Sequence, residues 1–237
     1  MWILFVLLGA LTTLVVYSRR YANPYKLEFI FGKKGAGRST RMVSRMVSDL
    51  KHGWHVYTDM SDCVLPGVRI INSDDLGKFI PEPNSALYLD EAGIKFDNRN
   101  YKNFPPELRD FFKYQRKYKC KVCMNSQSFD IDKKIRDVTD RMILQTSILN
   151  MFTLSRPIRR SVALVEATAQ GDSRIADNLK FEGILSWRIY YMPKYFKYFE
   201  SFKAPERPQI DFRLIPGTIK KIKEKNPEKA LRLDDDD

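Results

Sequence analysis

The stretch of sequence that decides the fold is Lys26-Leu27-Glu28-Phe29-Ile30-Phe31-Gly32-Lys33-Lys34-Gly35-Ala36-Gly37-Arg38-Ser39. Its first part is rich in aromatic and branched apolar residues, which predicts a strand over 26–31. The rest follows the pattern Gly-x4-Gly-Lys-Ser/Thr, in which glycines let backbone N–H groups converge on phosphate. We therefore predict a nucleotide-phosphate loop made of Gly32, Lys33, Lys34, Gly35, Ala36, Gly37, Arg38, Ser39 and Thr40.

One position departs from this pattern, because Arg38 stands where the lysine that reaches the terminal phosphates is expected. Arginine keeps the positive charge but is a larger, planar group. Nucleotide binding should therefore survive the change more readily than well-aligned hydrolysis. Ser39 supplies the hydroxyl that such loops use to bind Mg²⁺.

The residues after the loop alternate between helical and strand patterns. Helical spacing of apolar residues predicts helices over 39–50 and 107–117, the second begun by Pro105-Pro106. Short apolar runs predict strands over 55–57, 68–71, 86–89 and 121–124. This alternation through about residue 150 predicts an α/β fold of the P-loop NTPase class, with a mainly parallel sheet covered by helices.

The strand over 86–89 ends in Asp90-Glu91, which matches a Walker B motif. In such a motif the first acid holds hydrated Mg²⁺ and the second orients or deprotonates the attacking water. We therefore predict ATP and Mg²⁺ as ligands, Ser39 and Asp90 as metal ligands, and Glu91 and Arg38 as catalytic residues. Gln127, after the next strand, is either a third catalytic residue that senses the γ-phosphate or an ordinary loop residue.

Basic residues crowd the region between these motifs. Most belong to a solvated helix face, and one arginine is expected to act on the nucleotide of a neighbouring subunit. Arg99 and Arg116 are the two candidates for that role.

From Arg141 onward, apolar runs alternate with polar turns and predict antiparallel strands, which form a β-rich C-terminal extension over 151–203. Its aromatic residues are either core, a partner contact or a platform that stacks on nucleic acid. They are Tyr190, Tyr191, Tyr195, Phe196, Tyr198, Phe199 and Phe202. Residues 204–237 read as a linker and a charged tail.

The uncharged run from Trp2 to Tyr17 predicts a transmembrane anchor over residues 1–20, followed by the NTPase domain over 25–150. A cleaved signal peptide and a buried core helix are the alternatives. Arg19, Arg20 and Lys26 follow the run, which predicts a single-pass protein of the bacterial inner membrane with its N-terminus outside and its body in the cytoplasm.

The net charge of +12 at pH 7 indicates an anionic partner, which could be nucleotide, nucleic acid or lipid. The three cysteines do not suggest a disulfide framework. Cys120-x-x-Cys123 is half of a zinc-ribbon pattern, but no second cysteine pair follows it.

Further motifs accompany the phosphate loop. They are Leu89-Asp90-Glu91-Ala92 with Phe96 and Arg99, Phe111-Phe112-Lys113-Tyr114-Gln115-Arg116, Asn125-Ser126-Gln127-Ser128, and Ile131-Asp132 followed by Ile135-Arg136. Over roughly residues 27–145 this series resembles the zonular occludens toxin (Zot) domain family, the assembly ATPases of filamentous phages and prophages. The resemblance implies an oligomeric virion-assembly protein of the host inner membrane that uses ATP to extrude single-stranded DNA phage.

Three hypotheses follow for the function. The leading one is a membrane-anchored ATPase for phage assembly and DNA export, with phage coat or assembly proteins, single-stranded DNA and further copies of the chain as partners. The second is a nucleotide-binding membrane scaffold that does not hydrolyse. The third is a signalling or toxin-like membrane protein whose activity does not depend on Asp90 and Glu91.

Overall fold

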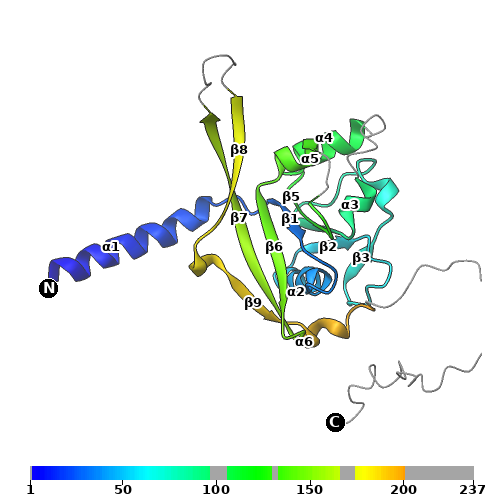
Figure 1. Ribbon diagram of the computed structural model, residues 1–237, viewed down its shortest axis with the longest axis horizontal. Helices are drawn as coiled ribbons and strands as arrows, with labels where there is room; N and C mark the ends of the chain where they lie inside the picture. Colours follow the sequence, from blue (N-terminus) through cyan, green and yellow to red (C-terminus); the bar gives the residue numbers. More distant parts are fainter. Residues whose placement is uncertain (1, 97–105, 130–132, 166–173, 201–237) are drawn as a thin grey trace, which may run out of the picture. The chain divides into compact units, whose positions relative to one another are not determined.

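A computed structural model describes residues 2–96, 106–129, 133–165 and 174–200 (Figure 1). Its central layer is a sheet with the strand order β3-β2-β4-β5-β1-β6-β7-β8, in which β9 pairs with β7. The strands are β1 (Leu27–Phe31), β2 (His55–Thr58), β3 (Val68–Ile70), β4 (Ser85–Leu89), β5 (Cys120–Ser126), β6 (Arg141–Ile148), β7 (Phe152–Val165), β8 (Arg174–Phe181) and β9 (Arg188–Tyr191). The helices are α1 (Trp2–Ser18), α2 (Arg38–Lys51), α3 (Ala92–Lys95), α4 (Pro106–Tyr114), α5 (Lys133–Val138) and α6 (Pro193–Phe196).

The first six strands in this order, β3 to β6, pair in parallel. The mainly parallel α/β sheet predicted from the sequence is therefore confirmed. β1 lies between β5 and β6, and β5 separates it from β4. Because the carboxyl ends of parallel strands meet at one edge, the loops after β1, β4 and β5 come together there.

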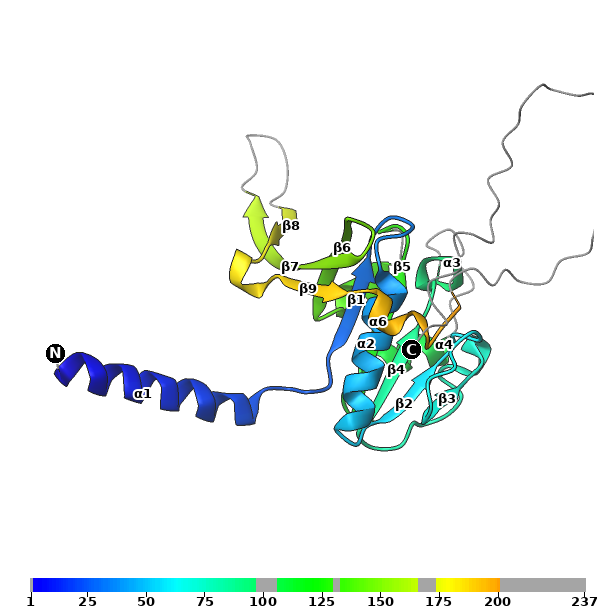
Figure 2. The same cartoon turned by 90° about the horizontal axis from the view of Figure 1, so that it is seen from below.

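Two apolar cores cover the two faces of the parallel strands. On one face, α2 lies against the sheet (Figure 2), and its Met42 and Met46 pack with Ile30 and Tyr88. On the other face, Leu108, Phe111 and Phe112 of α4 pack with inward-facing residues such as Phe29. The alternation of Phe29 and Ile30 between the two cores explains why β1 is apolar except at Glu28, which pairs with Arg45 of α2.

The antiparallel part begins at β6, which is parallel to β1 on one side and antiparallel to β7 on the other. β7 continues past β6 and pairs antiparallel with both β8 and β9. The antiparallel strands predicted from residue 141 onward are observed in the pairing of β6 with β7 and of β7 with β8 and β9, whereas β6 joins the parallel sheet on its other side. The short helix α6 follows β9 and was not predicted.

The helix predicted over 107–117 instead spans Pro106–Tyr114. Lys119 has a left-handed backbone with φ of 52°, and Cys120 N–H donates to the carbonyl of Gln115. The chain therefore turns sharply after α4 and enters β5, which leaves no room for a longer helix.

The predicted membrane anchor is wrong. The uncharged run forms α1, which has 17 residues and reaches about 25 Å at 1.5 Å per residue, against a hydrocarbon core of about 30 Å. Over the residues that the structure describes, no helix combines the length and the apolar character needed to span a bilayer. The prediction of a single-pass membrane protein with its N-terminus outside is therefore wrong as well.

Candidate phosphate-binding site

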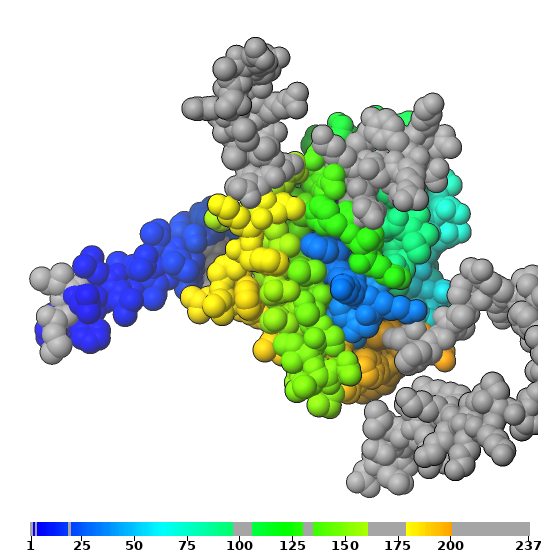
Figure 3. All heavy atoms as spheres, viewed as in Figure 1, coloured from blue at the N-terminus to red at the C-terminus, as the bar shows by residue number. Residues whose placement is uncertain are grey.

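The predicted phosphate loop connects β1 to α2. In Figure 3 the blue atoms of this part of the chain reach the surface in the middle of the view. Gly35 and Gly37 have φ of 77° and 82°, a left-handed conformation that side chains other than glycine rarely adopt. Gly32 N–H donates to the Ser126 carbonyl at 3.3 Å, and Ala36 N–H to the Lys33 carbonyl at 3.0 Å. These bonds tie the loop to β5 and close it into a turn.

The N–H groups at the start of α2 are free to bind an anion. Within the residues that the structure describes, no protein acceptor bonds the N–H of Gly35, Gly37, Arg38 or Ser39, and Gly37 provides no side-chain cap. A helix N-terminus carries a partial positive charge, and free N–H groups there are suited to phosphate. Lys33 and Lys34 are exposed beside them and add positive charge.

Arg38 is buried, with only 8% of its side chain exposed. Its Nη2 lies 3.3 Å from Oε1 of Glu91, and Gln127 Nε2 donates to the same oxygen at 3.1 Å. Its Nη1 is buried and has no hydrogen-bond partner among the described residues. The three residues predicted to be catalytic therefore lie together, and one buried donor of Arg38 remains available for a ligand.

Asp90 follows β4 at the same edge of the sheet. The N–H of Glu91 donates to Oδ1 of Asn125 at 3.0 Å and to Oδ1 of Asp90 at 3.1 Å. These bonds accompany a left-handed backbone at Glu91, with φ of 50°, which is strained for a glutamate. A strained backbone of this kind persists only where surrounding contacts hold it, and here it keeps the Glu91 side chain beside Arg38.

Asp59 and Asn125 belong to this site, although the sequence analysis assigned neither of them a role in it. Asp59 Oδ1 accepts from the N–H of Asp90 at 2.7 Å, and its Oδ2 pairs with Lys95 at 2.6 Å. Asp59 follows β2 and Asn125 lies near the end of β5. Polar residues at the carboxyl ends of parallel strands were the signal that could have found both.

Burial raises the pKa of Asp90, and the negative charges of Glu91 and Asp59 raise it further, against a hydrogen bond from Asn125 that lowers it. Burial also raises the pKa of Asp59, while Lys95 lowers it. The site therefore brings together two carboxyl groups, those of Asp90 and Asp59, whose ionised forms are disfavoured by burial. A bound cation would relieve this cost.

This charge predicts that Asp90→Asn stabilises the protein. An acid whose folded-state pKa is raised binds its proton more tightly in the native state, so its ionised form costs stability once the pH exceeds that pKa. The gain should therefore be largest near neutral pH and shrink as the pH falls toward 3.8, the ordinary pKa of an aspartate. Urea unfolding between about pH 7 and about pH 4 measures it.

Asp75→Asn is the matched control, because Asp75 is exposed in the 3-10 helix Ser73–Asp75. It should change stability little at any pH in that range. A gain for Asp90→Asn that is equal at all pH values would contradict the electrostatic explanation.

The remaining predicted residues are placed as follows. Ser39 is half-buried in the first turn of α2, and Thr40 beside it is buried. The roles of Ser39 and Asp90 as Mg²⁺ ligands stay predictions. Arg116 is exposed in the turn after α4, and Arg99 lies outside the described residues.

Cys120 and Cys123 lie on opposite faces of β5, since one packs in each of the two cores. They are both buried, and burial raises the pKa of Cys120 to about 11 and also raises that of Cys123. Two thiols on opposite faces cannot bind one metal ion.

The aromatic residues of the extension divide between core and surface. Phe199 is buried in the core under α2, with Tyr195 and Tyr198 packed against it, whereas Tyr191 and Phe196 are exposed. Phe202 lies outside the described residues. Core packing therefore accounts for part of the cluster.

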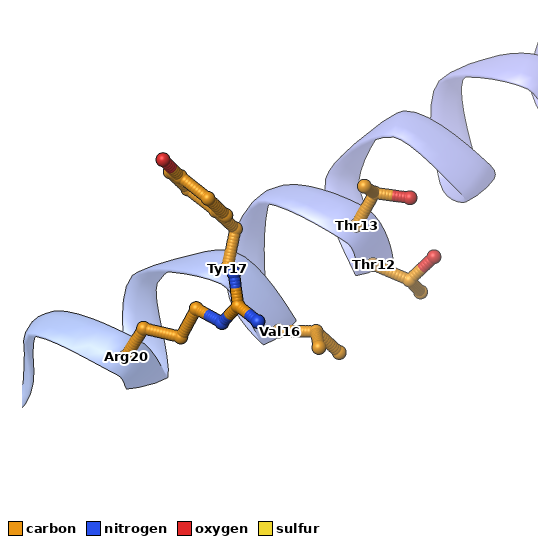
Figure 4. A pocket seen from close by; sticks show the side chains of 5 residues that line it. All are labelled: Thr12, Thr13, Val16, Tyr17 and Arg20. Atoms are coloured by element: carbon orange, nitrogen blue, oxygen red, sulfur yellow. The ribbon is translucent and has the colours of Figure 1, made fainter.

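A shallow hollow lies along α1 and the turn that follows it (Figure 4). It is lined by Thr12, Thr13, Val16, Tyr17 and Arg20. All five side chains come from one continuous stretch, which cannot enclose a small molecule as a concave site does. We assign it no function.

No protein-family model and no curated protein matches this chain. Among solved structures, the N-terminal domain of zonular occludens toxin from Neisseria meningitidis is similar, with a TM-score of 0.50 and 15% identity over 74% of this chain and 99% of that chain. The genome packaging NTPase B204 from Sulfolobus turreted icosahedral virus 2 has a TM-score of 0.42 and 18% identity over 54% of this chain and 79% of that chain. The first likeness shows the fold, and it confirms the predicted Zot-like P-loop fold.

Proposed function

We propose that this chain is a P-loop ATPase that acts in filamentous phage assembly and the export of phage DNA. The observation that carries the ATPase part of this proposal is the buried Arg38 of the phosphate loop, which contacts Glu91 and keeps one guanidinium donor without a partner among the described residues. A buried donor that lacks a partner is costly unless a ligand completes it. The γ-phosphate of ATP would do so.

The surroundings of Arg38 support nucleotide as that ligand. The free N–H groups of the loop would receive the phosphates, as other P-loops do. Ser39 and Asp90 would hold Mg²⁺, which neutralises the charge that develops on the phosphates. The raised pKa of Asp90, caused mainly by burial, fits a carboxylate that a cation accompanies.

Hydrolysis needs a group that orients or deprotonates water. Glu91 lies beside the buried guanidinium and is held in place by its strained backbone and by Gln127. In this arrangement the Arg38 guanidinium stays paired with the Glu91 carboxylate until phosphates compete for the guanidinium. Nucleotide binding would then free the Glu91 carboxylate to act on water.

Assembly partners are proposed from the family resemblance and the charge of the chain. The net charge of +12 suits single-stranded DNA, and phage coat or assembly proteins are the expected protein partners. We propose a homo-oligomer in which an arginine of one subunit reaches the nucleotide bound by the neighbouring subunit. Of the two candidate arginines, Arg116 is the one that lies among the described residues.

Arg38→Ala should weaken ATP binding by about tenfold or more, since a charge-assisted hydrogen bond contributes about 1.5–3 kcal/mol. Titration of the full chain with a fluorescent ATP analogue measures the Kd. Lys113→Ala removes an exposed cation from α4 and should leave the Kd unchanged. Equal affinity of the Arg38→Ala and unaltered proteins would refute the role of Arg38.

The second candidate function is a scaffold that binds nucleotide but does not hydrolyse it. The contact of Arg38 with Glu91 favours this function too, because it holds Glu91 in an ion pair. Phosphate release by the unaltered chain and by Arg38→Lys separates the two. Clear turnover by the unaltered chain rules out the scaffold. Turnover that appears only in Arg38→Lys supports it.

The role in assembly is tested in cells that release filamentous phage. Replacing Asp90 and Glu91 together with alanine should abolish phage release while the protein is still made. Unchanged phage release would overturn the motor function and favour a signalling or toxin-like role.

A further inference from the structure

The start of the antiparallel part touches the phosphate loop through a buried polar cluster. It consists of Gln145 on β6 and of Thr153 and Ser155 on β7, each at most 3% exposed. Gln145 Nε2 donates to Ser155 Oγ at 2.7 Å, and Gln145 Oε1 lies 2.8 Å from Thr153 Oγ1. The single hydroxyl proton of Thr153 can be donated to only one acceptor, and the shorter contact, 2.6 Å to the carbonyl oxygen of Ala36, identifies that oxygen as the acceptor. The hydroxyl of Thr153 therefore joins this cluster to the loop.

The bond to Ala36 determines the direction of a loop amide. A peptide bond is planar and trans, so the carbonyl of Ala36 and the N–H of Gly37 point in opposite directions. When Thr153 holds the carbonyl, the N–H of Gly37 points away from β7. That N–H has no protein acceptor among the described residues and is one of the groups proposed to bind phosphate.

Steric contacts reinforce this arrangement at both ends of the loop. A Cβ atom added to Gly37 would lie 2.7 Å from Cβ of Thr153 and 2.5 Å from Sδ of Met192. A Cβ atom added to Gly32 would lie 2.5 Å from the carbonyl oxygen of Gln145. Residues of β6 and β7, together with Met192, therefore lie close to two of the three glycines of the loop.

We infer that Thr153 is a positioning residue for phosphate binding. Its hydroxyl orients the Ala36–Gly37 peptide so that the N–H of Gly37 is presented to the nucleotide. This inference rests on the proposed function, and it gives the antiparallel part a role in nucleotide binding. A partner that moved β7 would change nucleotide affinity through this one hydroxyl.

The test compares three variants of the full chain. Thr153→Val keeps the shape but removes the donor, and should raise the Kd for ATP by about five- to tenfold. Thr153→Ser keeps the hydroxyl and should bind within about twofold of the unaltered chain. Ser155→Ala disrupts the same buried cluster without touching Ala36, and should lower the melting temperature but leave the Kd within about twofold.

A second readout does not depend on ATP. Selective ¹⁵N-glycine labelling reduces the amide spectrum to the 11 glycines, among which Gly37 can be followed. Its cross-peak should move in Thr153→Val and stay in place in Thr153→Ser.

The outcomes separate the inference from the function on which it rests. Native affinity in Thr153→Val, or equal losses in Thr153→Val and Ser155→Ala, overturns the positioning role. If the unaltered chain binds no ATP, the proposed function fails, and the Gly37 cross-peak alone decides whether Thr153 orients the loop. An unmoved cross-peak in Thr153→Val then refutes that role as well.

Discussion

Glu91→Gln should lower ATP turnover by about two to four powers of ten while the protein still binds ATP. Glutamine keeps the size of the side chain but cannot accept a proton from water. It also removes the negative charge that pairs with Arg38 at 3.3 Å, so the guanidinium becomes free for phosphate and the Kd for ATP should not rise. Steady-state phosphate release and ATP titration on the same preparation measure both effects.

Glu107→Gln is the control for this variant, because Glu107 is exposed in the first turn of α4 and lies outside the site. It should retain full turnover. If Glu91→Gln hydrolyses ATP as fast as the unaltered chain, Glu91 is not the group that activates water.

Phe29→Ala should lower the free energy of unfolding by about 3–5 kcal/mol, the range for deleting a buried phenylalanine. Phe29 has no exposed surface, and its ring lies 5.6 Å from that of Phe31 and 6.1 Å from that of Phe129, measured between centroids. The cavity would open in the strand that carries the phosphate loop. Urea denaturation measures the loss.

Ile80→Ala serves as the comparison, because this isoleucine is 74% exposed. It should change the free energy of unfolding by less than about 0.5 kcal/mol. Similar losses in the two variants would mean that the core on the α4 face of the sheet does not support β1.

The sequence predicted the parts of the site that follow local rules. A strand, a glycine loop and a helix in that order place Gly35, Gly37 and Arg38, because each depends on backbone conformation within a few residues. Asp90-Glu91 could be found for the same reason, since an apolar strand ends directly before them. The structure then places Glu91 beside Arg38 and Gln127.

Other parts depend on contacts between residues far apart in the sequence. Asp59 contacts Asp90 only because β2 and β4 are neighbours, and Thr153 reaches Ala36 across 117 positions. β6 pairs in parallel with β1 and antiparallel with β7. An alternating pattern of apolar residues does not reveal which strands will be its neighbours. The membrane prediction failed because a run without charge is not sufficient for a span, and no described helix is both long and apolar enough to cross a bilayer.

The position of β1 in the sheet has a consequence for synthesis on the ribosome. Both neighbours of this strand come much later in the chain, since Leu27 pairs with Val122 and Glu28 with Arg141. Contacts of such long sequence separation form slowly, because a large loop must close first. While the nascent chain still lacks β5 and β6, the largely apolar Leu27–Phe31 segment has neither of its strand neighbours and is exposed to aggregation. Chaperone binding to nascent chains should therefore be strongest before residue 144 has emerged.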